Sequence, residues 1–284
     1  MSNDKREGNE VFSASQAQQA GFQAVNVMKD DFGFETPIDL VPLPSKGAIY
    51  SVESGLSNKD TLEVRSMTAK EEDILTSRAL IKKGTVITEL IRSCLTDKRI
   101  DVDDMISGDR NAVMTALRIT GYGADYKVEI NCPACDERQS QEFSLSELPV
   151  KYLEINPVTE GANLFEFSLP VSKKRVHFKF LTGRDEQEMS LISERKKKQG
   201  LKTDSLVTSR LQHSIIAIEN VTDKNKINTF ISNMPARDSL ALRKYMDKNE
   251  PGIDMKSWMT CNQCDEHSEV RLPLGASFFW PDSD

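Results

Sequence analysis

Four of the five cysteines form two pairs with the same spacing, Cys132-Pro-Ala-Cys135 and Cys261-Asn-Gln-Cys264. Two cysteines separated by two residues can place both sulfurs on one metal ion, and four thiolates make a closed tetrahedral zinc site. We therefore predict one structural zinc ion bound by Cys132, Cys135, Cys261 and Cys264. An iron–sulfur cluster, two redox-active pairs, or no bound metal are the alternatives.

The residues around each pair favour zinc over redox chemistry. A redox-active CxxC begins a helix in a βαβ context. Here alternating segments typical of strands precede the pairs ("DYKVEIN", "DMKSWMT") and follow them ("SQEFSL", "SEVRLPL"). Four thiolates around Zn²⁺ leave a formal charge of about −2. Side chains that could offset this charge are Lys127, Arg138, Lys256, Arg271 and His267.

The remaining reactive residue types do not form a catalytic pattern. Cys94 lies on the apolar face of an expected helix, which predicts a small buried hydrophobic side chain. His267 follows Cys264 closely and could replace a cysteine ligand, but we expect an exposed polar residue. His177 and His213 are expected in a strand and a helix. The sequence contains no phosphate-binding loop, HExxH helix or GxSxG elbow, so we predict that the protein is not an enzyme.

The chain also repeats itself. The second CxxC lies 129 residues after the first, and "MISGDRNAVMTAL" then falls on "MPARDSLALRKYM". Upstream, "LEVRSMTAKEEDIL" resembles "VHFKFLTGRDEQEM" at a shift of 114, with an insertion around "SERKKKQGLKTDSLV". At these shifts the matched pairs include Met105 and Met234, Asp109 and Asp238, Ala112 and Ala241, Lys127 and Lys256, and Thr68 and Thr182. Chance similarity of helical segments is the alternative to a tandem duplication.

Local signals predict the elements of each repeat. Thr68 and Glu71 form a capping box that begins a helix, and Gly84 ends it. "VITELIRSCL" has helical periodicity. A further helix near residues 109–119 is expected to stop at Gly121 and Gly123. In the second copy, the helix matching "VITELIRSCL" is predicted to carry Leu211, Ile215, Ile216 and Ile218.

These elements predict an α+β fold made of two copies of a helical unit with short strands, each ending in a CxxC hairpin. We expect an extended or disordered arm over residues 1–42, a first repeat over 43–150 and a second over 151–284. The arm could order on a partner or along the body, or be a flexible terminus. Phe278, Phe279 and Trp280 are expected to be buried in the body beside the second hairpin, or else in a partner's pocket.

The composition is ordinary for a soluble globular protein, with 284 residues, 38% hydrophobic and 29% charged. No apolar run is long enough to span a membrane, and the N-terminus has no secretory signal, so we expect a protein that stays inside a cell. The net charge of −7 argues against broad nucleic-acid binding. A zinc-ribbon nucleic-acid-binding regulator is the alternative function.

Several motifs together resemble one known family. "LPSKGAIY", "LEVRSMTAKEEDILTS", "GDRNAVMTALRITGYG", the CxxC pairs and "LPLGASFFWPD" are similar to the T4-type bacteriophage baseplate hub subunits or hub assembly proteins. The resemblance runs from about Leu43 to the end of the chain. It implies a structural or assembly role without catalysis, other phage tail proteins as partners, and a location in the host cytoplasm during assembly or in the virion tail.

Overall fold

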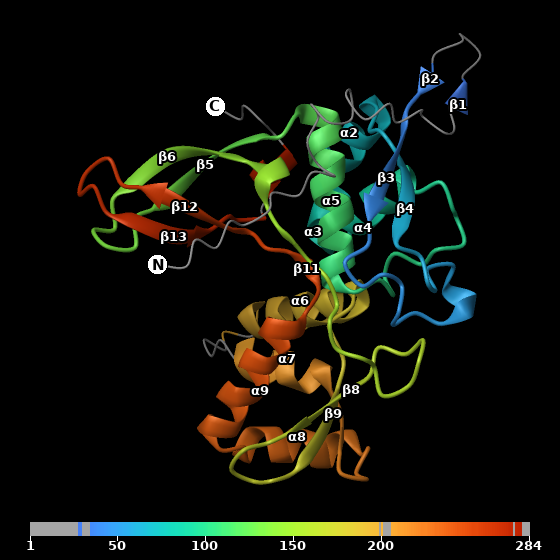
Figure 1. Cartoon of the computed structure of the whole chain (residues 1–284), viewed down its shortest axis with the longest axis vertical. Helices are drawn as coiled ribbons and strands as arrows, with labels where there is room; N and C mark the ends of the chain where they lie inside the picture. The colour runs from blue at the N-terminus through green and yellow to red at the C-terminus, as the bar shows by residue number, and fades with distance from the viewer. Residues whose placement is uncertain (1–27, 30–34, 199, 201–205, 275, 280–284) are drawn as a thin grey trace.

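The structure is a computed structural model that describes residues 28–29, 35–198, 200, 206–274 and 276–279. Helices and small antiparallel sheets form two bodies, one above the other in Figure 1, and the two CxxC hairpins extend together from one side. This mixed helix-and-strand architecture agrees with the predicted α+β class. One continuous apolar core runs through both bodies.

The first body is built around helix α5 (Ser107–Tyr122), which is buried over most of its length. Strands β3 (Ile38–Pro42) and β4 (Thr61–Arg65) form a hairpin against it. The other elements are β1 (Met28–Lys29), β2 (Glu35–Thr36), α2 (Ala69–Thr76), α3 (Arg78–Lys83), α4 (Val86–Cys94), β5 (Asp125–Asn131), β6 (Arg138–Ser144) and β7 (Val150–Lys151).

The second body has a three-stranded antiparallel sheet with helices around it. The sheet order is β10-β9-β8, from β8 (Phe165–Ser168), β9 (Arg175–Phe178) and β10 (Ile215–Ile218). The helices of this body are α6 (Gly183–Lys198), α7 (Leu206–Ser214), α8 (Lys224–Asn233) and α9 (Ala236–Asn249). The chain then passes through β11 (Gly252–Ile253), which pairs with β7, to the hairpin of β12 (Lys256–Thr260) and β13 (His267–Arg271), which lies beside β5 and β6 in Figure 1.

The helices α2 and α6 begin in the same way, each after a β-hairpin. An acidic residue in the first turn bonds to a threonine and to a positively charged side chain. Glu71 accepts hydrogen bonds from the Thr68 backbone and hydroxyl, as in the predicted capping box, and from the Arg65 guanidinium. The corresponding residues 114 positions later make the same contacts. Asp185 accepts from the Thr182 backbone and hydroxyl and from Lys179.

Two aspartates near the starts of α5 and α9 have equivalent contacts. Asp109 Oδ1 accepts from the backbone N–H of Ser45, in the loop that follows β3. Asp238 accepts from the backbone N–H groups of Val171 and Ser172, in the loop that follows β8. Each buried carboxylate therefore ties a hairpin loop to the first turn of a helix.

The prediction that Ile215, Ile216 and Ile218 lie in a helix is wrong. Helix α7 ends at Ser214, and these three residues form β10, which pairs antiparallel with β9. Leu211, the fourth residue assigned to that helix, does lie in α7. The cause is that a short apolar run has no periodicity that separates strand from helix.

The predicted stops around α5 were half correct. The helix continues through Gly121 and ends at Gly123, whose N–H bonds to the Ile119 carbonyl.

The segment predicted as one helix from Thr68 to Gly84 is two helices, α2 and α3, which meet at Ser77. Ser77 has an extended conformation, which interrupts the helical hydrogen bonds there.

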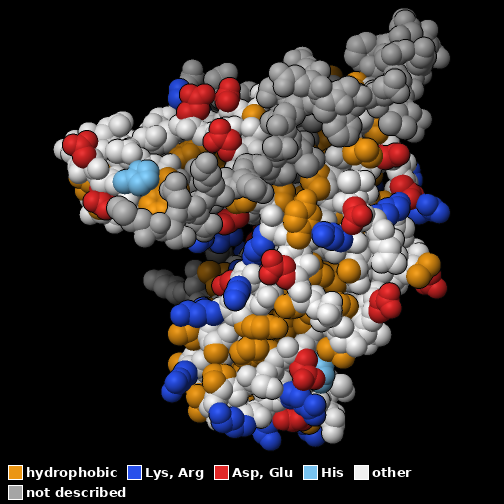
Figure 2. Space-filling model, in the orientation of Figure 1, with side chains coloured by type: hydrophobic (Ala, Val, Ile, Leu, Met, Phe, Trp, Pro, Cys, Tyr) orange, Lys and Arg blue, Asp and Glu red, His pale blue; other side chains and the backbone are white. Residues whose placement is uncertain are grey.

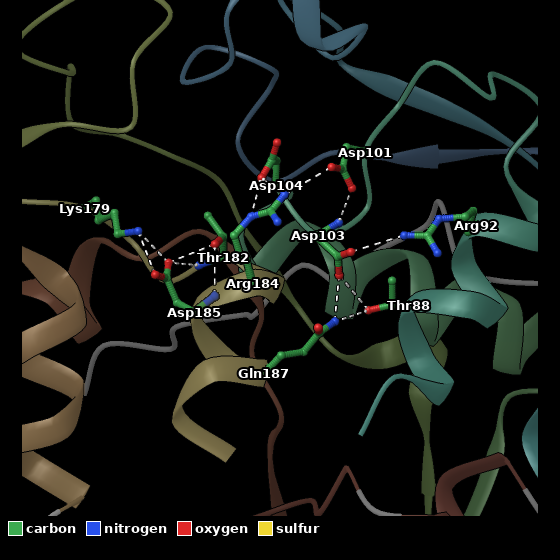
Figure 3. Close-up of polar contacts among 10 residues, drawn as sticks. All are labelled: Thr88, Arg92, Asp101, Asp103, Asp104, Lys179, Thr182, Arg184, Asp185 and Gln187. Carbon is green, nitrogen blue, oxygen red and sulfur yellow. Dashed lines mark hydrogen bonds and ion pairs between the residues drawn. The ribbon is translucent and has the colours of Figure 1, made fainter. Parts of the chain in front are cut away.

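A polar junction joins the two bodies where α6 begins (Figure 3). Arg184 donates hydrogen bonds to Asp101 and Asp104, at 3.2 Å and 2.8 Å. Gln187 Nε2 lies 2.7 Å from Asp103 Oδ1. Backbone bonds run alongside, since the Gly183 N–H donates to the Met105 carbonyl at 3.0 Å. The loop before α5 and the start of α6 are thus held together by side chains and main chain alike.

The ends of the chain meet their predictions in part. Residues 1–27 and 30–34 of the predicted arm lie outside the described residues, but its last five residues form β3 and belong to the first body. Phe278 and Phe279 are buried in the protein's own body, as favoured, while Trp280 lies outside the described residues. Phe278 packs on Tyr126 at the base of the first hairpin. The tail therefore crosses to the other half of the chain.

Candidate metal centre

Each CxxC occupies the turn of an antiparallel hairpin. Cys132 follows β5 and Cys135 precedes β6, while Cys261 follows β12 and Cys264 precedes β13. Neither pair begins a helix, so the helix start that lowers a thiol pKa in redox-active CxxC proteins is missing at both pairs. The hairpins agree with the strands predicted on either side of each pair.

The first turn is a tight knuckle closed by backbone hydrogen bonds. The Cys132 N–H donates to the Glu137 carbonyl at 2.8 Å, and the Asp136 N–H donates to the Cys132 carbonyl at 2.9 Å. Asp136 has a φ of 60°, a left-handed conformation that aspartate tolerates better than most residues. The Ala134 N–H points at the Cys132 sulfur, 3.4 Å away.

The second turn repeats this geometry. The Cys261 N–H donates to the Glu266 carbonyl at 3.0 Å, and the Asp265 N–H donates to the Cys261 carbonyl at 3.0 Å. Asp265 has a φ of 55°, and the Gln263 N–H lies 3.4 Å from the Cys261 sulfur. Both knuckles therefore present their cysteines with the same backbone conformation.

The two knuckles bring all four sulfurs together. Cys132 Sγ lies 3.8 Å from Cys264 Sγ, and Cys135 Sγ lies 3.6 Å from Cys261 Sγ. All four sulfurs lie within 4.8 Å of one another. A tetrahedron of sulfurs around zinc, with bonds of about 2.3 Å, needs sulfur separations of about 3.8 Å. The arrangement therefore fits a four-coordinate metal ion without rearrangement of the backbone.

Side chains of β6 hold the second knuckle in place. Gln139 and Gln141 donate from Nε2 to the Thr260 carbonyl at 3.4 Å and 3.3 Å. The Asn262 N–H donates to Gln139 Oε1 at 2.9 Å. The sequence analysis missed these two glutamines, because nothing local in "RQSQEFS" indicates a contact with a segment about 120 residues away. They position the cysteines of one hairpin against those of the other.

The thiols differ in how readily they ionise. Backbone N–H groups of Cys264 and Gln263 point at the Cys261 sulfur and lower its pKa to about 7. The Glu137 N–H acts in the same direction on Cys135, but burial and the three neighbouring thiols raise its pKa to about 12. Four thiolates this close repel one another, so a bound cation would supply the charge that allows all four to ionise.

The basic side chains expected to offset the thiolate charge are mostly engaged elsewhere. Arg138 forms an ion pair with Glu129, and Lys256 pairs with Glu269 at 3.0 Å. His267 is exposed, as predicted, and stacks on Trp258 instead of joining the four sulfurs. The backbone N–H groups of the knuckles are therefore the dipoles that face the sulfurs.

The other singled-out residues lie apart from the cluster. Cys94 is fully buried on α4, as predicted, and burial raises its pKa to about 12. His177 lies on β9 beside Glu166, and His213 lies on α7, where its Nδ1 is 2.9 Å from the Ser209 carbonyl oxygen. These positions agree with the predicted strand and helix. None of the three belongs to a group of possible metal ligands within the described ranges.

The fold and the site together define a mixed α/β protein whose two halves meet at a cluster of four cysteines, a potential metal site that involves both hairpins. The chain belongs to the T4 bacteriophage base plate protein family, whose model matches residues 47–280. This match covers most of the chain and confirms the resemblance to T4-type baseplate proteins.

Two further comparisons found nothing. Neither the curated proteins nor the solved structures contain a significant match to the chain. None of the helices in the described ranges has the length and apolar character of a membrane-spanning segment.

Proposed function

We propose that this protein is a non-enzymatic structural or assembly component of the hub of a contractile-tailed phage baseplate. It acts through contacts with other tail proteins, in the host cytoplasm during assembly and in the virion tail if it is retained. Membership of the base plate family supports this role. The observation that carries the proposed mechanism is the cluster of four cysteines, because it brings together two hairpins that lie far apart in the sequence.

We propose that Cys132, Cys135, Cys261 and Cys264 bind one structural zinc ion. Each hairpin supplies two sulfurs, so neither half completes the site alone. Zinc takes four thiolates in a closed tetrahedron, and the sulfur separations of 3.6 Å and 3.8 Å suit that geometry. The ion would crosslink the halves of the chain and limit their relative movement when partners bind.

We also propose that the two halves, residues 43–150 and 151–284, arose by tandem duplication. Three sets of contacts recur at matched positions and support this origin: the bonded pairs Glu71–Arg65 and Asp185–Lys179, the loop-binding Asp109 and Asp238, and the two knuckles. A four-sulfur site between copies would follow from the origin, because each copy contributes one CxxC hairpin.

Elemental analysis of the recombinant full-length chain tests the metal. We expect about one zinc and no iron per chain, and loss of that zinc in Cys132→Ser and in Cys261→Ser. Both variants should melt at lower temperature, because structural zinc contributes on the order of 10 kcal/mol in small domains. Cys94→Ala is the matched control and should keep its zinc. A metal-free chain with an unchanged melting temperature contradicts the zinc proposal.

Mass spectrometry of purified virions and of assembly intermediates tests the role. We expect the chain in baseplate intermediates, in contact with other tail proteins. The competing function, a zinc-ribbon regulator that binds nucleic acid, predicts DNA binding that weakens steeply with salt and no association with tail proteins. Gel-shift measurements at two salt concentrations separate the two functions.

A further inference from the structure

The second hairpin carries an exposed tryptophan in a fixed orientation. Trp258 lies on β12 with 49% of its surface exposed. Its ring stacks on His267 at a centroid distance of 4.9 Å and an interplanar angle of 10°. Thr260 Oγ1 lies 3.2 Å from His267 Nδ1 and holds the imidazole in turn. One face of the indole is thus covered by the protein while the ring remains accessible.

A groove of about 260 Å³ lies beside this tryptophan, between β6 and β12. Within the described part of the chain, each of these strands has a ladder partner on one side only. Residues that line the groove include Glu142, Ser144, Glu147, Leu148, Lys256 and Trp258. Figure 2 shows hydrophobic, histidine and acidic side chains together at the end of the molecule where the hairpins lie.

The charge of the groove is negative. Glu142 and Glu147 are both exposed, and no ion pair involving either is present among the residues that the structure describes. Lys256, the cation on the opposite wall, is already paired with Glu269 at 3.0 Å. An aromatic face beside two carboxylates attracts a cation, through the ring quadrupole and through charge.

The first hairpin lacks this arrangement. The positions 129 residues before Trp258 and His267 are Glu129 and Arg138, which form an ion pair with each other. The first hairpin thus carries two opposite charges that neutralise each other at this place. The second hairpin carries an accessible aromatic pair there. All four side chains are exposed, so the difference lies at the surface of the hairpins and is open to a partner.

We propose that the groove binds an arginine side chain presented by an extended segment of another tail protein. The guanidinium would lie over Trp258 and donate hydrogen bonds to Glu142 and Glu147, since arginine stacks on aromatic rings and bonds carboxylates at the same time. The identity of the partner class rests on the proposed baseplate function. The chemistry of the groove rests on the geometry alone.

Fluorescence of Trp258 tests the groove directly. The chain has two tryptophans, so Trp280→Phe leaves Trp258 as the only indole. We expect N-acetyl-arginine amide to change its emission saturably, and the neutral isostere N-acetyl-citrulline amide to bind at least about fivefold more weakly. Glu142→Gln/Glu147→Gln should weaken arginine binding by a similar factor, while Glu129→Gln should not. Equal responses to both probes, or no effect of the double variant, overturn the proposal.

Assembly measurements separate this proposal from the baseplate function. Phage assembled with Trp258→Ala or with the double glutamine variant should incorporate about fivefold less of the chain, or none, while the purified variants keep wild-type zinc content and melting temperature. Normal incorporation of these variants would contradict the proposed binding of arginine in the groove, but would leave the proposed baseplate role intact. Failure of the wild-type chain to associate with any tail protein contradicts the baseplate role instead.

The chain itself offers another occupant, because Lys5 and Arg6 precede the described residues. If deletion of residues 1–27 alone changes the Trp258 emission and strengthens binding of the arginine probe, the groove serves the chain's own N-terminus and the partner proposal fails. An unchanged emission after the deletion supports a partner in trans. Sedimentation also shows whether the full chain self-associates. Self-association that is lost in Trp258→Ala would mean that a second copy of the chain fills the groove, and would overturn the proposal of a different tail protein as the partner.

Discussion

Arg118 on α5 donates a hydrogen bond of 2.8 Å from Nε to the carbonyl oxygen of Phe278, 160 residues later in the chain. The same guanidinium donates to the carbonyl oxygens of Gly123 and Asp125, where the first hairpin begins. The Tyr126 hydroxyl adds a bond of 2.8 Å to the Pro273 carbonyl. The end of the second half is thus locked onto the first half, on the side of α5 from which the hairpins extend.

Replacement of Phe278 with alanine should therefore destabilise the whole chain. The ring is fully buried and meets Tyr126 edge-on at 5.3 Å, so its loss leaves a cavity in the shared core. We expect a loss of about 3–5 kcal/mol in the free energy of unfolding, measured with urea. Leu240→Ala, at an exposed position on α9, should change it by about 0.5 kcal/mol or less. A stable Phe278→Ala chain that fails only in assembly would place the ring in a partner instead.

Two glycines of α5 should respond in opposite ways to alanine. A Cβ at Gly108 would lie 1.8 Å from the Pro251 carbonyl oxygen, which is backbone and cannot move aside. We expect Gly108→Ala to cost about 1–3 kcal/mol or more, although alanine is the better helix former. A Cβ at Gly121 would lie 2.4 Å from Met67 Cε, the far end of a flexible side chain that can shift, so Gly121→Ala should be neutral or stabilise by up to about 1 kcal/mol. Thermal unfolding of both variants checks the pair.

Much of this fold was predictable from local patterns, and the misses have a common cause. The capping box at Thr68 and the strand before Cys132 depend on residues close in sequence, and both are present. The convergence of the four sulfurs was predicted from spacing, because thiolates at CxxC spacing suit one ion. By contrast, β10 depends on pairing with β9, and the contact of Arg118 with Phe278 depends on how distant segments pack. Such contacts leave no periodicity to detect.

The buried carboxylate of Glu71 should make stability depend on pH. Burial alone would raise its pKa, but donors on Arg65, Ser93 and Thr68 hold the pKa well below its ordinary value of 4.5. A lowered pKa in the folded state stabilises the fold above pH 4.5, and this contribution is lost as the pH falls toward the folded pKa. Glu71→Gln should therefore cost about 3–5 kcal/mol at pH 7, and the difference from wild type should shrink below pH 4.5.

Glu72→Gln is the matched control for that experiment. Glu72 is the next residue of α2, is exposed, and accepts a hydrogen bond from the Tyr122 hydroxyl that a glutamine oxygen can also accept. Its effect on the free energy of unfolding should stay within about 0.5 kcal/mol at either pH. Urea titrations at pH 7 and pH 4 measure both variants. A pH-independent difference between Glu71→Gln and wild type contradicts the assignment of this charge.

Asparagine should be tolerated at Asp109 and not at Asp238, although both residues tie a hairpin loop to a helix. The two oxygens of Asp238 each accept from a backbone N–H, of Val171 at 2.7 Å and of Ser172 at 2.9 Å. A backbone N–H cannot become an acceptor, so the amide group of asparagine would face a donor. Asp238→Asn should therefore leave one buried donor unsatisfied and cost about 1–3 kcal/mol.

At Asp109 only one oxygen accepts from backbone, the N–H of Ser45, while the other accepts from the hydroxyls of Ser45 and Tyr50. A hydroxyl can rotate and accept from the amide group of asparagine, as a backbone N–H cannot, while Ser45 Oγ and the Tyr50 hydroxyl keep the hydrogen bonds that they accept from the Gly47 and Ile106 N–H groups. Burial also raises the pKa of Asp109, so a neutral side chain avoids the cost of a buried charge at pH 7. Asp109→Asn should therefore cost less than Asp238→Asn in urea unfolding. Equal losses in the two variants would show that charge, and not donor geometry, holds the loops.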